Sequence, residues 1–314
     1  MTQTSQSNIF QGHMGYDLKM AGSLPEKFEF IDPHVHFWDH SEIGLTWPYL
    51  EQGFDHPRLK GMHRLQAPRF AVPEFISQTG EIDVKAIVHI HSAREEGLGL
   101  ETSWIQRIAQ DKDLIRGIVA RVSTTDEGLA TLLSANSQHN LLRGVRDMDA
   151  PQTIGGEDFN AGFAAIVSSG LSVEFPVPLA HFKSVGVLAE QHPEAVIILG
   201  HCGLPERRDK QYFKQWSQGL LKLSKSKNVV VKISAIASGA DPLWTVASIR
   251  PWIECCVETF GPSRAMFASN WPIDRLYRSY EELINSYREI ARQWTLGEQN
   301  SLFGQTATRV YRLT

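Results

Sequence analysis

The feature that most constrains this 314-residue chain is a regular alternation of short apolar segments with amphipathic ones. The segments AVIILG (195–200) and VVVKIS (229–234) are apolar almost throughout, which is typical of parallel strands covered on both faces. Each of eight such strands is followed by a predicted helix, and this pattern favours a (β/α)8 barrel. The predicted strands span residues 28–32, 84–91, 114–122, 141–148, 171–177, 195–200, 229–234 and 264–269.

An open, doubly wound α/β sheet is the alternative fold. Such a sheet usually has a glycine-rich phosphate turn after its first strand, whereas the first strand here ends in histidines. The barrel is therefore favoured. We expect residues 1–26 to form a flexible N-terminal arm and residues 27–314 to form one barrel domain, with a long loop over 41–69 after the first strand.

Composition limits the partners and the compartment. Net charge is −4, so there is no basic signal for nucleic acid binding. No apolar run approaches the roughly 20 residues that span a bilayer, and the N-terminus lacks a secretory pattern. The cysteines are Cys202, Cys255 and Cys256, an odd number that argues against a disulfide framework. These features predict a cytoplasmic protein without nucleic acid or membrane partners, and they are compatible with a homo-oligomer.

The first strand ends in an unusual motif, FEFIDPHVHFWD (28–39). In an extended chain, residues two apart share a face, so His34 and His36 point the same way. Two imidazoles at a strand end could form half of a metal site or a pair of hydrogen-bonding groups. The alternative is two surface histidines in a loop.

Further histidines follow two other predicted strands. His89 and His91 lie at the end of the second strand and His201 at the end of the sixth, so five of the twelve histidines fall at three strand ends. The chemistry of such barrels sits at the carboxyl ends of the strands. We therefore expect these imidazoles to meet in one cavity, although each alone is more often a hydrogen-bonded structural residue.

Charged residues also occur at the strand ends. Of Arg143 and Arg146, one could form an ion pair at the edge of the core and the other could hold a substrate carboxylate. Lys232 interrupts an apolar strand, so it must be paired or reach a polar lumen. Its structural alternative is an ion pair with Glu174 or Asp147.

The loop 41–69 is rich in aromatic and basic residues and lacks periodicity. It is a candidate lid, in which Arg58 or Arg64 would supply a second contact to an anion. The alternatives are a surface loop packed by its own aromatic residues and a loop at a subunit interface. Trp271, which follows the eighth strand, is a further candidate for substrate binding.

The motifs resemble the amidohydrolase superfamily, and specifically the amidohydrolase-related group that includes 2-pyrone-4,6-dicarboxylate lactonase, sugar lactonases and sulfomuconolactone hydrolase. The resemblance implies a barrel with His34, His36 and His201 as catalytic residues, and as ligands if a metal is bound. It also implies that Arg143 or Arg146 clamps a carboxylate. The matching stretches are IDPHVHFWD, LLRGVRDM, HPEAVIILGHCGLP, NVVVKIS, MFASNWPID and LFGQTATRVYRL.

The chain departs from the family pattern at one position. The family has an aspartate that activates water where this chain has Asn270. An amide cannot accept a proton as a general base, so Asp274 and Glu174 are the alternative bases. Loss of a carboxylate also weakens a divalent site. We therefore expect either no required cofactor or one weakly held Zn or Mn ion.

Three functions are compatible with these residues. The first is a hydrolase that opens a lactone of a small carboxylated molecule, in which histidines polarise the carbonyl attacked by water. The second is a metal-dependent, non-oxidative decarboxylase of an aromatic acid. The third is a catalytically reduced homologue that only binds its ligand, which the replacement at Asn270 suggests.

Overall fold

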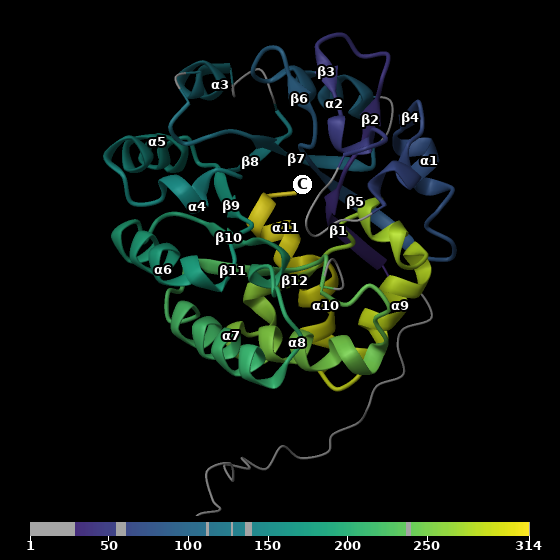
Figure 1. Cartoon of the computed structure of the whole chain (residues 1–314), viewed down its shortest axis with the longest axis vertical. Coiled ribbons are helices and arrows are strands. Elements are labelled where there is room, and N and C mark those ends of the chain that lie inside the picture. Colours follow the sequence, from purple (N-terminus) through teal and green to yellow (C-terminus); the bar gives the residue numbers. More distant parts are fainter. Residues whose placement is uncertain are drawn as a thin grey trace, which may run out of the picture.

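Eight parallel strands follow one another in sequence order around a barrel (Figure 1). The computed structural model describes residues 29–54, 61–110, 113–126, 128–135, 140–236 and 240–313. Every predicted strand is present, and the predicted (β/α)8 barrel is confirmed; the N-terminal arm lies outside the described residues. The barrel strands are β1 (Glu29–Val35), β5 (Asp83–Ile90), β7 (Ile115–Arg121), β8 (Leu142–Arg146), β9 (Ser172–Phe175), β10 (Ile197–Leu199), β11 (Val229–Ile233) and β12 (Ala265–Phe267).

Helices surround the strands on the outside of the barrel (Figure 1). Thr245 and Ser279 begin two of them with side-chain caps on the backbone amide three residues on. In the described part of the chain, no helix combines the length and apolar character needed to cross a membrane. The helices are α1 (Val72–Ile76), α2 (Leu100–Ala109), α3 (Leu129–Ala135), α4 (Ala150–Thr153), α5 (Glu157–Ser168), α6 (Phe182–Gln191), α7 (Lys210–Leu223), α8 (Val246–Phe260), α9 (Tyr280–Ala291), α10 (Leu296–Asn300) and α11 (Thr306–Tyr311).

Alternation along the strands separates two cores. Val173 and Phe175 of β9 belong to the large apolar layer between the strands and the helices. Val88, Ile198 and Val230 instead form a smaller cluster in the lumen, together with residues of α11. The last helix therefore fills one end of the barrel, and polar side chains in the lumen must lie toward the other end.

The barrel closes between β1 and β12 through a buried carboxylate. One bridge joins Val35 to Trp271, and no regular ladder continues it. Asp32 accepts hydrogen bonds from the Ser269 amide at 3.0 Å and from the Tyr280 hydroxyl at 2.9 Å. Burial raises the pKa of Asp32 to about 6. At this seam the carboxylate of Asp32 therefore adds to a single backbone bridge.

The loop after β1 is more ordered than the sequence predicts. Two small antiparallel pairs hold it: β2 (Trp38–Asp39) with β4 (Arg69–Phe70), and β3 (Leu45–Thr46) with β6 (Arg94–Glu95). Trp47 is fully buried, and its Nε1 donates to Ser92 Oγ at 3.2 Å. The expectation of a loop without regular structure is therefore corrected. Arg58 lies outside the described residues, and the lid stays a prediction.

Candidate active site

A break in strand register directs the first histidine pair into the lumen. Ile31 contacts the lumen cluster, so strict alternation would send residues 34 and 36 outward. The pairing of β1 with β5 shifts between Asp32 and Val35, and this irregularity reverses the phase. His34 and His36 consequently face each other inside the barrel, with their Nε2 atoms 3.1 Å apart.

Three charged side chains lie beside His34 in the lumen. Lys232 Nζ donates to Glu174 Oε2 at 2.6 Å, so the predicted ion pair forms with Glu174 and not with Asp147. Glu174 Oε1 lies 3.7 Å from Arg146 Nε and 3.8 Å from His34 Nδ1. The lumen therefore holds two cations and one carboxylate next to the imidazoles.

His201 reaches the same space from a strained turn after β10. Its backbone is left-handed at φ 53°, and Cys202 follows at φ 55°. Such conformations cost a non-glycine residue of order 1–3 kcal/mol, and they persist where the surroundings over-determine them. The ring of His201 lies 4.7 Å from that of His34. Imidazoles from two distant segments, β1 and the turn after β10, therefore meet in the lumen.

Hydrogen-bond partners fix the ring protons of all three histidines. His36 Nδ1 lies 2.8 Å from the Ile90 carbonyl, which can only accept, so Nδ1 carries the proton. His34 Nε2 must then donate to His36 Nε2. Arg146 Nη2 can only donate, so His201 Nε2 accepts from it at 2.8 Å and His201 Nδ1 donates to Ser234 Oγ.

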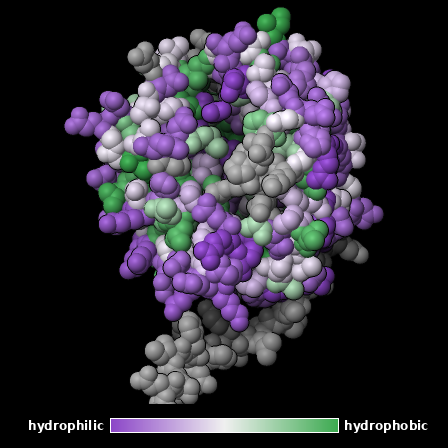
Figure 2. All heavy atoms as spheres, in the orientation of Figure 1, coloured by the Kyte–Doolittle hydropathy of each residue, from purple (hydrophilic) through white to green (hydrophobic). Residues whose placement is uncertain are grey.

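Burial and neighbouring cations favour neutral imidazoles on β1. Burial, followed by Arg146, lowers the pKa of His36 to about 3. Burial, followed by Lys232, lowers the pKa of His34 well below its usual value. His36, His201 and Arg146 retain 5%, 6% and 9% of their surface, whereas His34, Glu174 and Lys232 retain none. The first three therefore line the opening and the second three lie beneath them. Figure 2 shows the same orientation as Figure 1, with the visible face hollowed near its middle.

The second histidine pair faces the opposite way, which corrects its predicted place in the lumen. Val88 and Ile90 occupy the lumen face of β5, so His89 and His91 point toward α2. His89 Nε2 and His91 Nε2 lie 2.8 and 2.9 Å from the two oxygens of Glu101. These histidines are therefore ligands of a buried carboxylate, and they do not join the first pair.

Sequence reasoning missed Glu101, although a signal was present. Glu101 lies on the same helical face as Trp104 and Ile105, in the apolar stripe of α2, and it is fully buried. A carboxylate in an apolar stripe requires buried donors. His89 and His91, one strand earlier, are those donors.

Two further candidates lie away from the lumen opening. Arg143 sits three residues before Arg146, near the start of β8, and its Nη1 donates to the Asn140 and Leu142 carbonyls. Trp271 is buried, with Nε1 donating to Gln78 Oε1 at 2.9 Å. These contacts correct the expectations that Arg143 clamps a carboxylate and that Trp271 binds substrate.

Asn270 and Asp274 form a pair of their own after β12. Asn270 is left-handed at φ 57°, a conformation in which asparagine is enriched, and its Nδ2 donates to Asp274 Oδ1 at 2.9 Å. Asp274 is 4% exposed and accepts this amide proton. Asp274, a predicted alternative to the base that is missing at position 270, is thus hydrogen-bonded to Asn270 itself.

The donors of the lumen fit a tightly held divalent cation poorly. His34 Nε2 and His36 Nε2 lie 3.1 Å apart, a spacing suited to two ligands of one ion, and binding an ion would require the proton between them to leave. Arg146 and Lys232 place two positive charges beside them, and Asn270 supplies no charge. A dication needs more anionic or neutral donors than this. The predicted set of His34, His36 and His201 is therefore better suited to hydrogen bonding.

A second group of residues has the composition of a metal site, but its carboxylate oxygens are already hydrogen-bonded. Among the described residues, one ligand atom each of His91, Glu95 and Glu101 lies within 4.8 Å of the others. However, Glu95 accepts from the Gly99 and Glu101 amides at 2.7 and 2.8 Å. Glu101 accepts from both histidines, so a metal would have to displace existing bonds.

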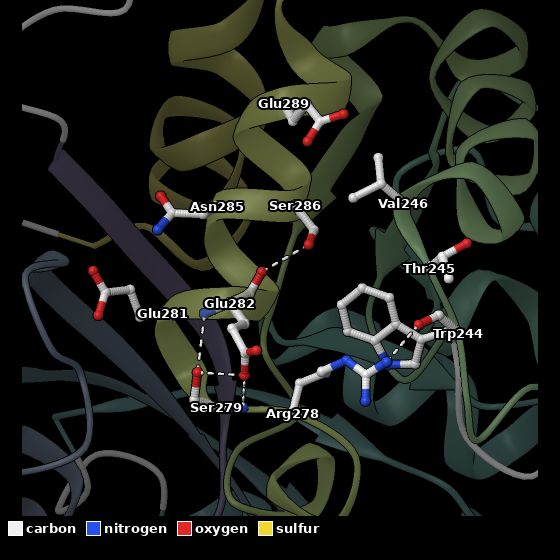
Figure 3. Close-up of a pocket in the computed structure, with 10 residues that line it drawn as sticks. All are labelled: Trp244, Thr245, Val246, Arg278, Ser279, Glu281, Glu282, Asn285, Ser286 and Glu289. Carbon is white, nitrogen blue, oxygen red and sulfur yellow. Dashed lines mark hydrogen bonds between the residues drawn. The ribbon is translucent and has the colours of Figure 1, made fainter.

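A separate surface cavity of about 460 Å³ lies between α8 and α9 (Figure 3). Arg278 lies over the Trp244 ring, 5.2 Å from its centre, and donates to the Trp244 carbonyl. The cap residue Ser279 pairs with Glu282. These groups satisfy one another, and the lining contains none of the histidines discussed above: it consists of Trp244, Thr245, Val246, Arg278, Ser279, Glu281, Glu282, Asn285, Ser286 and Glu289.

Two solved structures share the fold. An amidohydrolase from Burkholderia multivorans with bound zinc has a TM-score of 0.78 at 24% identity, covering 91% of this chain and 100% of that one. The 5-carboxyvanillate decarboxylase of Novosphingobium aromaticivorans, complexed with manganese, has a TM-score of 0.63 at 16% identity, covering 91% and 96%. At these identities the likeness establishes the barrel alone.

Sequence comparison goes further than fold. The L-fucono-1,5-lactonase of Burkholderia multivorans is 25% identical over 300 residues, covering 90% of this chain and 96% of the relative. The family model described as amidohydrolase matches residues 31–313. The predicted resemblance to the amidohydrolase-related group with lactonase members is therefore confirmed, and the chain belongs to the amidohydrolase family.

Proposed function

We propose that this protein hydrolyses a lactone of a small carboxylated molecule. One observation carries the proposal: three imidazoles and the guanidinium of Arg146 meet at the carboxyl ends of β1, β8 and β10. The active sites of such barrels lie at this end of the strands. The lactonase among the relatives supports the reaction class.

Arg146 is the proposed anion contact. It lines the opening, and its guanidinium offers several donors in a fixed plane. With Lys232 beneath it, the lumen attracts a substrate carboxylate and stabilises the oxyanion that forms when water attacks a carbonyl. His34 Nε2 donates to His36 Nε2, so His34 orients the imidazole that lines the opening.

His201 is the proposed general base. Its Nε2 carries the lone pair that accepts from Arg146 Nη2, so it becomes available to water once Arg146 turns to the substrate carboxylate. Ser234 holds the ring through Nδ1, an arrangement in which a third group orients the base. The pKa of about 3 makes His36 a poor base at neutral pH. Glu174 is beneath the opening and bound to Lys232, and Asp274 is bound to Asn270, so both suit positioning better than proton transfer.

The proposed reaction balances without a cofactor. His201 Nε2 takes a proton from water while the water oxygen bonds to the lactone carbonyl carbon. The ring C–O bond then breaks, and the same proton passes from His201 to the leaving alkoxide. The product is an open-chain hydroxy acid, so each turnover releases a carboxylic acid that a pH indicator detects.

A panel of lactones tests the proposal. It includes L-fucono-1,5-lactone, 2-pyrone-4,6-dicarboxylate and muconolactone, so that neutral and carboxylated rings are compared. We expect the carboxylated rings to be hydrolysed with the higher kcat/KM, and Arg146→Gln to lower that value about 100-fold. Arg143→Gln, three residues earlier on the same strand, is the matched control and should change it less than about threefold. Absence of turnover on every lactone would refute the proposal.

A metal-dependent decarboxylase is the second candidate, favoured by the manganese-bound decarboxylase that shares the fold. It requires a tightly held metal. Elemental analysis of the purified protein separates the two candidates, because one Zn or Mn ion per chain together with CO2 release from an aromatic acid would favour decarboxylation. A ligand-binding homologue without activity would bind a carboxylated lactone in calorimetry and leave it intact.

A further inference from the structure

Glu101 gathers the end of β5 around a single buried carboxylate. Its Oε2 accepts from the Ala93 amide at 2.7 Å, and both oxygens accept from the Ser92 amide at 3.1 Å. His89 and His91 add two imidazole contacts at 2.8 and 2.9 Å. Every one of these partners lies within residues 89–93, so one side chain of α2 fixes the whole turn.

The same segment, residues 89–93, also binds the ring of His36 on the side away from the lumen opening. Ile90, in the middle of the segment bound by Glu101, accepts the His36 Nδ1 proton at 2.8 Å. This bond sets both the tautomer and the ring orientation of His36. Ser92 Oγ also reaches the Phe37 carbonyl at 3.4 Å, and the Phe37 ring stacks on His89 at 5.6 Å. The turn and the end of β1 are therefore joined at His36 and at Phe37.

A carboxylate is needed at this position for a chemical reason. All the groups that face Glu101 are N–H or O–H donors, and a carboxylate presents acceptors in every direction. An amide of the same shape would turn one NH2 group toward those donors and leave at least one of them without a partner. Because the side chain is fully buried, water cannot supply the missing acceptor.

We infer that Glu101 is a positioning residue for His36: its carboxylate fixes the turn 89–93, and the Ile90 carbonyl of that turn holds the imidazole in the lumen. The kinetic part of this inference rests on the proposed function, whereas the structural part does not. Glu101 touches neither the lumen nor a substrate, so its effect on the reaction passes through His36.

Nuclear magnetic resonance of histidine-labelled protein tests the inference directly. The His36 Nδ1 proton should give a slowly exchanging resonance, assigned by its loss in His36→Gln. In Glu101→Gln this resonance should disappear or broaden while circular dichroism stays native. On the best lactone, kcat should fall about 10- to 100-fold and KM should change less than about threefold.

Glu42→Gln is the matched control. Glu42 binds Arg107 Nη2 at 2.7 Å at the far end of α2, so this variant removes a carboxylate contact of the same helix without touching the turn. The His36 resonance and kcat should match the wild type. If Glu101→Gln fails to fold, Glu101→Asp keeps the charge but withdraws it by one methylene, and it should shift the resonance and lower kcat.

The outcomes separate the two proposals. A native His36 resonance in folded Glu101→Gln, or in Glu101→Asp where only that variant folds, overturns the positioning role. Loss of the resonance in a protein that hydrolyses no lactone upholds the positioning role and refutes the proposed function. An equal loss in Glu42→Gln would assign the effect to the helix as a whole and would also overturn the inference.

Discussion

The two His-x-His pairs of this barrel share a sequence pattern and differ in everything that follows from orientation. His34 and His36 face the lumen, where cations and burial keep them neutral. His89 and His91 face the helix layer, where they bind one carboxylate. The pairs lie on neighbouring strands. The comparison teaches that a one-residue change of phase decides whether such a pair takes part in chemistry or in packing.

The largest difference between the pairs should be kinetic. His201→Gln should lower kcat/KM on the best lactone by about 10²–10⁴, because it removes the proposed general base. His36→Gln should also lower it, because it removes an imidazole that lines the opening beside His201 and Arg146. His89→Gln should leave kcat/KM within about tenfold of the wild type, since the Ser92 and Ala93 amides still hold Glu101. Steady-state kinetics of the three variants measures this, and equal losses would erase the comparison.

The next difference should appear in stability. His89→Leu removes a donor from a buried carboxylate and should lower the free energy of unfolding by about 1–3 kcal/mol. His36→Gln should cost less, because its Nδ1 bond to the Ile90 carbonyl is a neutral one. Urea unfolding of both variants gives the two values. A greater loss for His36→Gln would contradict the assignment of the outer pair to packing.

A smaller effect should be seen in the pH dependence of stability. Burial alone would lower the pKa of His91, but the Glu101 and Glu95 carboxylates outweigh it and raise that pKa. A raised folded-state pKa contributes stability that is full below the unfolded-state value of about 6.5 and is lost as pH rises through the folded-state value. His91→Gln should therefore lower Tm more at about pH 6 than at about pH 9. A constant difference in Tm would show that His91 is not charged in the folded protein.

Chelation should have the smallest effect. Because the inner pair is hydrogen-bonded and flanked by Arg146 and Lys232, incubation with EDTA should change kcat/KM less than about twofold. The measurement is activity before and after dialysis against chelator, with added Zn and Mn as the reverse test. A loss restored by either ion would give the inner pair the role of metal ligands.

The sequence predicts the barrel well because buried parallel strands have a strong composition signal. All eight strands were expected within a few residues, and AVIILG and VVVKIS mark two of them without ambiguity. The convergence of His34, His36 and His201 also follows from their places at strand ends. Carboxyl ends of parallel strands meet at one face, so no detailed geometry is needed.

Orientation could not be predicted, because it depends on register. Pro33 signals an irregularity in β1, because proline within a strand is typical of bulges, but it does not say that the phase reverses between Asp32 and Val35 and turns His34 inward. For the same reason Arg143 and Arg146, three apart in RGVR, could not be told apart until the pairing of β8 was known. The two short strand pairs around Trp47 could not be predicted, because two-residue strands produce no periodic pattern in the sequence.

The plug at the closed end of the barrel makes the site depend on a distant part of the chain. The ring centre of Tyr311, in α11, lies 5.2 Å from Lys232 Nζ. The lysine that pairs with Glu174 is therefore packed against an aromatic ring. Tyr311 lies some eighty residues after Lys232 in the sequence. A variant truncated before Thr306 would lack α11, and one end of the barrel lumen below Lys232 and Glu174 would be unfilled. Assembly of the cavity must therefore wait until residues 306–311 have been made.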